Sequence, residues 1–204
     1  MTTLHDIHDH SIDVENRVIY LQSFNDAGED CGVDHRVANV FLKNIHHLGR
    51  NTAKSDKKIV IEMNIVGGEW SAGMAIYDAI VACPWHVTIN THAQAESMSS
   101  IILQAANHRV INKHAYFMCH YGSAFHDGTV PDMIASANWN KVVTEQMCAI
   151  YRDRMIKSKW AIDKYGTPTE RQVRMFLNKK LKDGDWYLFG DEIVNYGFAD
   201  EVFA

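Results

Sequence analysis

Short apolar runs alternate along the chain with stretches in which apolar residues recur at helical spacing. Runs with the length and β-branched content of buried strands cover residues 17–21, 59–63, 85–90 and 115–119. Helical spacing covers residues 37–48, 72–82 and 97–106. Strands that alternate with helices of about ten residues are typical of βαβ crossovers. We therefore expect an α/β fold with a mostly parallel sheet.

The pattern changes beyond residue 128. One long helix is predicted over 131–165, with an apolar stripe formed by Val142, Val143, Met147, Ile150, Tyr151 and Met155. Such a helix is long for a globular domain, so we expect it to protrude from the core or to pack on another subunit. Thr169 is suited to cap a further helix, and a short extended segment at 186–189 and a final helix at 191–196 follow.

The remaining segments define the domain boundaries. Residues 1–16 are polar and acidic and predict a flexible N-terminal leader. Turn-forming residues at 25–32 and polar residues at 50–57 predict two loops. A chain of 204 residues that is 47% hydrophobic can bury a substantial core. We expect a single domain over residues 17–204.

Composition excludes several classes of partner. The net charge is −5, from 20 basic and 25 acidic residues, and no basic cluster alternates with aromatic residues, so we expect no nucleic-acid partner. No apolar segment approaches the ~20 residues that span a bilayer, and the first residues carry no secretory signal. Cys83 and Cys119 lie in apolar stretches, as buried reduced thiols do. These features predict a cytoplasmic protein with no membrane contact.

Twelve histidines raise the question of a metal site. His5, His8 and His10 fall in the predicted leader, and His46 and His47 at a helix end. No acidic or thiol partner stands at ligand spacing from them. We expect no metal ion and no cofactor.

Ser97 is a candidate nucleophile because it stands between a predicted strand and a predicted helix. Free N–H groups and the helix dipole gather at a helix N-terminus and favour the negative charge that develops beside a nucleophile during attack on a carbonyl. Most serines at such positions are helix caps, and this interpretation of Ser97 stays open on the stretch alone.

Partners for Ser97 follow from the same topology. His120 ends the next predicted strand, where active-site groups collect in parallel sheets, although a core histidine would have the same pattern. Asp185 and Asp183 are both candidates for the acid that orients the imidazole, and their spacing along the chain does not distinguish them. Gly67 and Gly68 form either an ordinary tight turn or a site where backbone N–H groups approach a ligand. From these residues alone, a hydrolase and a protein without hydrolytic activity are about equally well supported.

Taken together, these segments resemble the proteolytic subunit of the Clp protease, the ClpP family. The spacing from Ala72 to Met98 matches without a gap, and an apparent insertion precedes Asp185. The resemblance covers residues 17–204 and rests on motifs in a fixed order: Gly67-Gly68, Ala72 to Asp78, Gln94 to Met98, Phe117 to His120, Asp185 to Leu188, and Tyr196 to Asp200.

The resemblance implies a ClpP/crotonase-like α/β spiral of βαβ units with a protruding handle helix at about 131–165. It also implies an assembly of two stacked heptameric rings, polypeptide substrates, and a Clp-type ATPase as unfoldase partner. The implied activity is that of a serine endopeptidase that works through an acyl-enzyme.

The resemblance also implies a role for each candidate residue. Ser97 corresponds to the nucleophile, His120 to the general base, and Asp185, in preference to Asp183, to the orienting acid. The oxyanion hole corresponds to the backbone N–H groups of Gly68 and Met98.

Several positions depart from the family pattern, and four of them bear on activity or assembly. Glu96 stands where alanine is usual, and we expect its side chain to point outward because burying an unpaired carboxylate is costly. Val60 and Glu62 replace aromatic residues of the ATPase docking cleft, and Trp186 replaces an arginine of the ring-to-ring contact. These departures favour a divergent member of the family, for example a phage-encoded one.

Two other functions remain open at this stage. The departures at Glu96 and Trp186 are also consistent with a catalytically weak or inactive ring subunit that has a structural or regulatory role. A crotonase-type acyl-CoA enzyme would share the fold and the paired-amide oxyanion hole. That class has no need of a serine–histidine–acid set, which argues against it.

Overall fold

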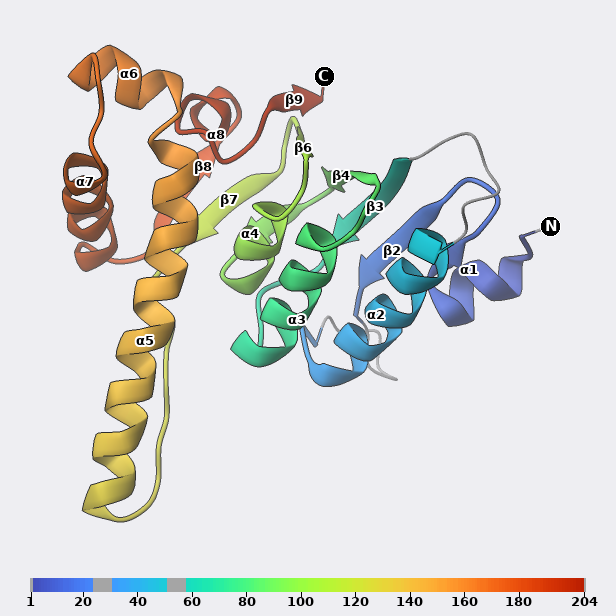
Figure 1. The fold of residues 1–204 in the computed structure, drawn as a ribbon, viewed down its shortest axis with the longest axis horizontal. Helices are drawn as coiled ribbons and strands as arrows, with labels where there is room; N and C mark the ends of the chain where they lie inside the picture. The colour runs from blue at the N-terminus through green and yellow to red at the C-terminus, as the bar shows by residue number, and fades with distance from the viewer. Residues whose placement is uncertain (1, 24–30, 51–57, 204) are drawn as a thin grey trace.

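The computed structural model describes residues 2–23, 31–50 and 58–203, so the predicted loops at 25–32 and 50–57 lie largely outside it. The helices are α1 (Leu4–His10), α2 (His35–Arg50), α3 (Trp70–Val81), α4 (Met98–Leu103), α5 (Val130–Met155), α6 (Lys159–Tyr165), α7 (Glu170–Lys182) and α8 (Asp191–Asn195) (Figure 1). The strands are β1 (Ile12–Asp13), β2 (Val18–Gln22), β3 (Lys58–Asn64), β4 (His86–Thr91), β5 (Gln94–Glu96), β6 (His108–Asn112), β7 (Tyr116–Cys119), β8 (Trp186–Phe189) and β9 (Glu201–Phe203).

The strands divide into two sheets. A six-stranded sheet has the order β1-β2-β3-β4-β6-β9 and is parallel except where β1 pairs with β2. In the second sheet, of three strands, β7 lies between β5, which is parallel to it, and β8, which is antiparallel. The predicted α/β fold with a mostly parallel sheet is confirmed. Helices α2, α3 and α4 lie along the same side of the larger sheet (Figure 1).

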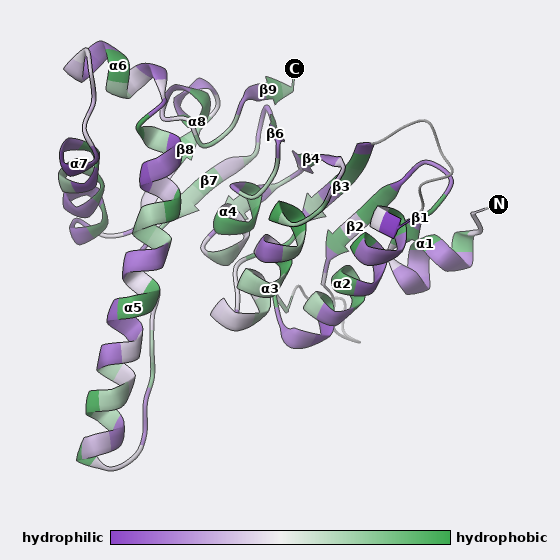
Figure 2. Cartoon of the chain, in the orientation of Figure 1, coloured by the Kyte–Doolittle hydropathy of each residue, from purple (hydrophilic) through white to green (hydrophobic). Residues whose placement is uncertain are grey.

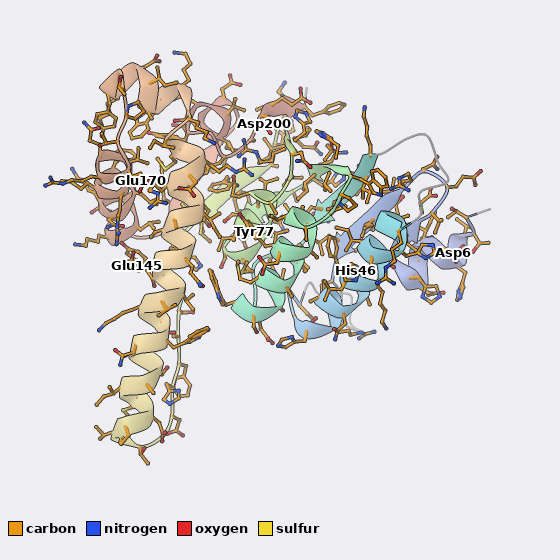
Figure 3. The ribbon with its side chains drawn as sticks, in the orientation of Figure 1. Asp6, His46, Tyr77, Glu145, Glu170 and Asp200 are labelled. Atoms are coloured by element: carbon orange, nitrogen blue, oxygen red, sulfur yellow. The ribbon has the colours of Figure 1, made fainter. Side chains whose placement is uncertain are left out.

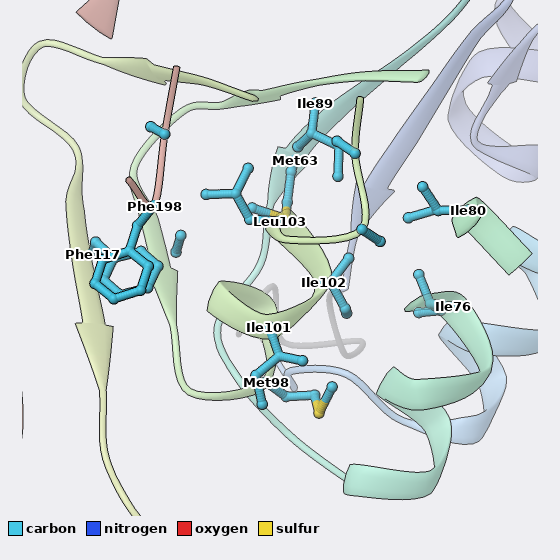
Figure 4. Packing of buried hydrophobic residues seen from close by; sticks show 14 of the residues in the cluster. Met63, Ile76, Ile80, Ile89, Met98, Ile101, Ile102, Leu103, Phe117 and Phe198 are labelled. Carbon is cyan, nitrogen blue, oxygen red and sulfur yellow. The ribbon is translucent and has the colours of Figure 1, made fainter. Parts of the chain in front are cut away.

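Alternation along the strands determines which side is covered. In β3, Ile59, Ile61 and Met63 are fully buried, whereas Val60 and Glu62 on the other face are only partly buried. Every residue of α4 is buried, so the core holds this helix on all sides. Figure 4 shows the resulting cluster, which includes Met63, Ile76, Ile80, Ile89, Met98, Ile101, Ile102 and Leu103. The core therefore fixes the position of the α4 N-terminus.

The predicted long helix over 131–165 forms two helices. Helix α5 ends at Met155, and a new helix, α6, begins after Ser158, whose hydroxyl accepts a hydrogen bond from the N–H of Ala161 at 3.1 Å. A serine cap inside the helical pattern thus explains the break. The first half of α5 extends away from the body (Figure 1), and hydrophobic positions recur along it (Figure 2). The large apolar residues exposed on this half are Val130, Met133, Ile134, Trp139 and Val142.

The prediction of a flexible leader over 1–16 is wrong for the described residues. Thr3 and Asp6 form a capping box that starts α1, a short helix with no buried residue. Strand β1 follows and pairs with β2, and the amide of Asn44 in α2 donates to the carbonyl of His10 at 2.7 Å. The cap and these tertiary bonds order a segment whose polar composition suggested flexibility.

Besides β1, three further short strands were not predicted: β5, β6 and β9. They have three to five residues, too few for alternation to be distinguished from a loop. Helix α4 also ends at Leu103, earlier than the predicted 106. The predicted cap of α7 is confirmed, since the Thr169 hydroxyl accepts from the N–H of Gln172.

A buried arginine joins α4 to the C-terminal segment. Arg109 donates from its backbone and its guanidinium to both carboxylate oxygens of Asp200, at 2.6 to 3.0 Å, and also to Gln104 and to the carbonyl of Gly197. Figure 3 labels Asp200 near the end of the chain. Burial acts to raise the pKa of Asp200, but Arg109 outweighs it and holds that pKa below its usual range.

We expect Asp200→Asn to lower the free energy of unfolding at pH 7 by about 2 kcal/mol, because the substitution leaves the buried Arg109 guanidinium without its counterion. The loss is limited because Asp200 itself is partly exposed to solvent. The lowered pKa of Asp200 means that this stability is present above the carboxyl's unfolded pKa of about 3.9 and is lost as the pH falls through the folded value. Urea unfolding at pH 7 and pH 3 measures it. The exposed ion pair of Asp163 with Lys159 provides the control, and equal effects of Asp163→Asn and Asp200→Asn would contradict the assignment.

Candidate active site

Ser97 lies at a sharp elbow between β5 and α4. Its backbone is at φ 52° and ψ −121°, which few residues other than glycine adopt, so the elbow is strained. Two hydrogen bonds hold it: the Ser97 N–H donates to the carbonyl of Met118 at 3.0 Å, and the Ser100 hydroxyl donates to the Ser97 carbonyl at 2.6 Å. The Ser97 hydroxyl forms no capping bond to α4. Ser97 thus occupies the N-cap position of α4, but its hydroxyl does not cap the helix.

His120 directly follows β7, the strand that pairs in parallel with β5. Because the C-terminal ends of parallel neighbours meet at one sheet edge, His120 arrives beside Ser97. The imidazole Nε2 lies 2.8 Å from the Ser97 hydroxyl oxygen, a hydrogen-bond distance. The His120 side chain is 26% exposed, so it is a partly open group at the sheet edge and not a core histidine.

Asp185 approaches the other side of the same imidazole. Strand β8 is antiparallel to β7 with Trp186 opposite Cys119, which brings the preceding residue, Asp185, next to His120. The His120 Nδ1 lies 3.4 Å from the Asp185 carboxylate oxygen. Asp183 is instead the residue that ends α7. Of the two acids with suitable spacing, Asp185 is the one in contact with the histidine.

Trp186 anchors the turn that carries Asp185. Its indole is buried and packs edge-on against Phe176 of α7, Tyr196 and Phe198, with ring centroids 4.9 to 6.0 Å apart. The Lys180 ammonium lies 5.5 Å from the centre of the indole ring. Helix α7 thereby supports the strand that follows Asp185.

Gly67 and Gly68 line the opposite side of the elbow. The Val33 N–H donates to the carbonyl of Gly67, and the Glu69 N–H donates to the carbonyl of Val33, both at 2.7 Å. This bridge turns the Gly68 N–H away from Val33. Side chains are excluded here: a Cβ on Gly68 would lie 2.2 Å from the Val33 carbonyl oxygen, and Gly68 has a φ of +151°.

Two backbone N–H groups near Ser97 are available for a ligand. Within the part of the chain that the structure describes, neither the Gly68 nor the Met98 N–H has a hydrogen-bond partner. The Met98 N–H belongs to the first turn of α4, whose donors have no acceptor inside the helix. Gly67 is close to both Ser97 and Met98, because a Cβ built on it would lie 3.1 Å from the Met98 nitrogen.

A cleft of about 650 Å³ opens in front of Ser97 and His120. The extended segment after His120 and one face of α5 form its far wall. Much of the lining is apolar or aromatic, and includes Trp70, Met98, Ile101, Trp139, Val143 and Met147. The cleft can therefore accept an apolar side chain next to the serine.

Glu96 has a partner outside the cleft. Its carboxylate accepts a hydrogen bond from the Tyr116 hydroxyl at 2.7 Å, on the face of the small sheet that also carries Tyr187 and Phe189. Burial and then this bond to a carboxylate raise the pKa of Tyr116 to about 12. The Glu96 side chain does not line the cleft, in agreement with the expected outward direction. It is nevertheless half-buried and is bonded to Tyr116.

We expect Glu96→Gln to leave kcat/KM for peptide hydrolysis within about threefold of wild type. The Glu96 carboxylate is bonded to Tyr116 and not to Ser97, and a partly exposed charge outside the cleft interacts only weakly with the reacting groups. Steady-state kinetics at low and at physiological salt measure it. A rise of more than tenfold in the variant would mean that the Glu96 charge opposes the reaction, contrary to the geometry.

No group of three or more His, Cys, Asp or Glu side chains within the described residues could hold a metal ion. Across the same part of the chain, no helix is both long and apolar enough to span a bilayer.

Reasoning from sequence missed the groups that support the elbow. Ser99 bonds to the backbone of Glu96, and Ser100 bonds to both Ser97 and the hydroxyl of the buried Tyr151, at 2.6 Å. The run of serines 97, 99 and 100 was visible as a cluster of short-range hydrogen-bonding residues. The contact of Val33 with Gly68 had no local signal, because more than thirty residues separate them.

Comparisons with known proteins identify one family over most of the chain. The sequence profile of the family described as Clp protease matches residues 30–204. ATP-dependent Clp protease proteolytic subunit 1 of Frankia casuarinae is 30% identical over 92% of this chain and 76% of its own length. Subunit 4 of Rhodococcus jostii is 27% identical over 84% of this chain and 80% of its own length, and subunit 1 of Mycobacterium bovis is 26% identical over 93% and 82%.

Proposed function

The chain belongs to the Clp protease family, and from this premise we propose that it is a serine endopeptidase that cleaves polypeptides through an acyl-enzyme. The observation that carries the proposal is the contact of one imidazole with both Ser97, at 2.8 Å, and Asp185, at 3.4 Å. A strained serine elbow, two N–H groups that have no partner among the described residues, and an adjacent cleft support it.

In the proposed mechanism the Ser97 hydroxyl attacks the carbonyl carbon of the scissile peptide bond, and the His120 Nε2 accepts the hydroxyl proton. Asp185 accepts a hydrogen bond from the Nδ1–H, which fixes the tautomer and stabilises the imidazolium. The carbonyl oxygen becomes an oxyanion that the N–H groups of Gly68 and Met98 bind. His120 then gives its proton to the leaving amine, and a water molecule, deprotonated by His120, hydrolyses the ester at Ser97.

Hydrolysis of short fluorogenic peptides with leucine, methionine or an aromatic residue on the acyl side of the scissile bond tests this function. The apolar cleft leads us to expect turnover of these peptides and much slower cleavage when that position holds aspartate. Absence of turnover by the assembled protein would favour the second candidate, an inactive ring subunit. The crotonase-type alternative is not favoured, because acyl-CoA chemistry needs no serine–histidine–aspartate set.

We propose that copies of the chain form heptameric rings stacked in pairs, with the active sites inside. The exposed apolar residues on the protruding half of α5, including Met133, Ile134 and Trp139, support a contact between copies there. Trp186, at the position of a ring-contact arginine in the family, is buried inside its own chain, so any ring pairing here uses other groups. The native mass of the assembly tests the number of subunits.

A Clp-type ATPase partner is part of the proposal, and its docking surface differs from the family pattern. Glu62 lies on the side of the sheet opposite the helices and is bonded to Asn90 at 2.9 Å and to His92 at 2.7 Å. The position of Glu62 is therefore polar where an aromatic residue is usual. The buried thiols of Cys119 and Cys148 support a reducing, cytoplasmic location.

A further inference from the structure

We infer that Glu69 is a specificity-determining residue, which favours substrates with a lysine or arginine close to the scissile bond and disfavours those with an acidic residue there. The inference rests on the proposed peptidase function and concerns the same cleft. It adds a charge preference to the apolar preference described above.

The backbone places Glu69 at the reacting centre. Glu69 directly follows Gly68, whose N–H is a proposed oxyanion donor, and it lines the same cleft as Ser97 and His120. Its own N–H is bonded to the carbonyl of Val33 at 2.7 Å, so the residue cannot move away from the elbow without breaking the bridge to Val33.

The carboxylate of Glu69 is free to meet a substrate. Glu69 occupies the N-cap position of α3, yet its side chain makes no capping hydrogen bond. The side chain is 58% exposed, and its carboxylate lies 3.4 Å from the Nε2 of His35, which is also an exposed group. An exposed pair of this kind is weak and gives way readily to a better-placed cation.

The Glu69 carboxylate sets the local charge of the cleft lining, because Asp185, the other carboxylate of the site, contacts His120 and does not line the cleft. Among the described residues that line it, Glu69 is the only acid, and no lysine or arginine is present to offset it. The remaining titratable lining groups are His120 and the hydroxyls of Tyr121 and Tyr151. Trp70, next in sequence, offers an apolar surface for the methylene stem of a lysine or arginine. A cationic substrate residue thus finds both parts of its side chain matched.

A series of internally quenched peptides tests the inference. Each peptide has one apolar residue on the acyl side of the scissile bond, and lysine, glutamine or glutamate is placed in turn at each of the three positions on either side of that bond. At one or more positions we expect wild-type kcat/KM to be about 3- to 10-fold higher for lysine than for glutamate, and the ratio to shrink with added salt. In Glu69→Gln the ratio should fall to within about twofold of unity, and in Glu69→Lys it should invert.

Glu201→Gln is the matched control, because Glu201 is also an exposed carboxylate at 3.3 Å from a histidine but lies outside the cleft. It should keep the wild-type ratio. Two results overturn the inference and leave the peptidase function intact. In the first, wild type cleaves all the peptides with equal kcat/KM for lysine and glutamate. In the second, the ratio of kcat/KM for lysine to glutamate is unchanged in Glu69→Gln. No turnover of any peptide overturns both the inference and the peptidase function.

Discussion

Replacing Ser97 by alanine is expected to lower kcat for peptide hydrolysis by about 10⁴-fold or more, because the Ser97 hydroxyl is the one that contacts His120 among the described residues. The loss should appear in kcat and not as a loss of substrate binding, since the variant keeps the cleft and the two free N–H groups. Stability should change little, because the hydroxyl caps no helix and alanine tolerates the positive φ about as well as serine. Steady-state kinetics and thermal unfolding measure the two effects.

Ser136→Ala is the control for Ser97→Ala, since Ser136 lies on α5 outside the cleft lining. It should retain wild-type rates. Activity of purified Ser97→Ala within tenfold of wild type, with Ser136→Ala unchanged, would show that a different residue is the nucleophile.

Gly67→Ala is expected to reduce kcat/KM by at least about 100-fold, although it touches neither the histidine nor the aspartate. The added Cβ would lie 2.5 Å from the Ser97 Cβ and 2.8 Å from its hydroxyl oxygen, closer than van der Waals contact permits. Either the serine or the Gly67 backbone must shift, and a displacement of about 1 Å is enough for a loss of this size. Kinetics are to be measured at a temperature at which circular dichroism shows the variant folded.

Gly49→Ala separates this steric effect from a general effect of glycine replacement. A Cβ at Gly49 would have Pro84 as its nearest neighbour at 3.9 Å, which is ordinary contact. Gly49 lies inside α2, where alanine is the better helix former. Folded Gly67→Ala with full activity would mean that the glycine pair does not define the geometry around the serine.

Hydrophobic periodicity predicted the longer helices and strands, which bury one face along most of their length. Helices α2 and α3 and strands β2, β3 and β4 were located within about two residues of their ends, as expected for strongly periodic segments. The placement of Ser97 and His120 at strand ends followed from the same pattern. The choice of Asp185 over Asp183 needed the family resemblance, because a difference of two residues in a turn has no periodic signal.

Features built by contacts distant in sequence escaped prediction. The ordered N-terminal segment depends on Asn44 in α2 and on pairing with β2, neither of which its polar composition reveals. The hydrogen bond from Tyr116 to Glu96 joins strands twenty residues apart, and the cleft that Glu69 lines has its far wall on α5, which lies more than sixty residues away in sequence. Local propensity is a weak guide wherever tertiary contacts of this kind decide the structure.

Mass spectrometry of the intact protein after reaction with a fluorophosphonate tests the central claim most directly, because this reagent reacts with serines activated by a neighbouring base. One adduct per chain is expected, located by peptide mapping on Ser97, and it should be lost in His120→Ala although that variant keeps the serine. Absence of any adduct on the folded wild-type protein, or an adduct on a serine other than Ser97, would contradict the assignment of this site as a serine peptidase centre.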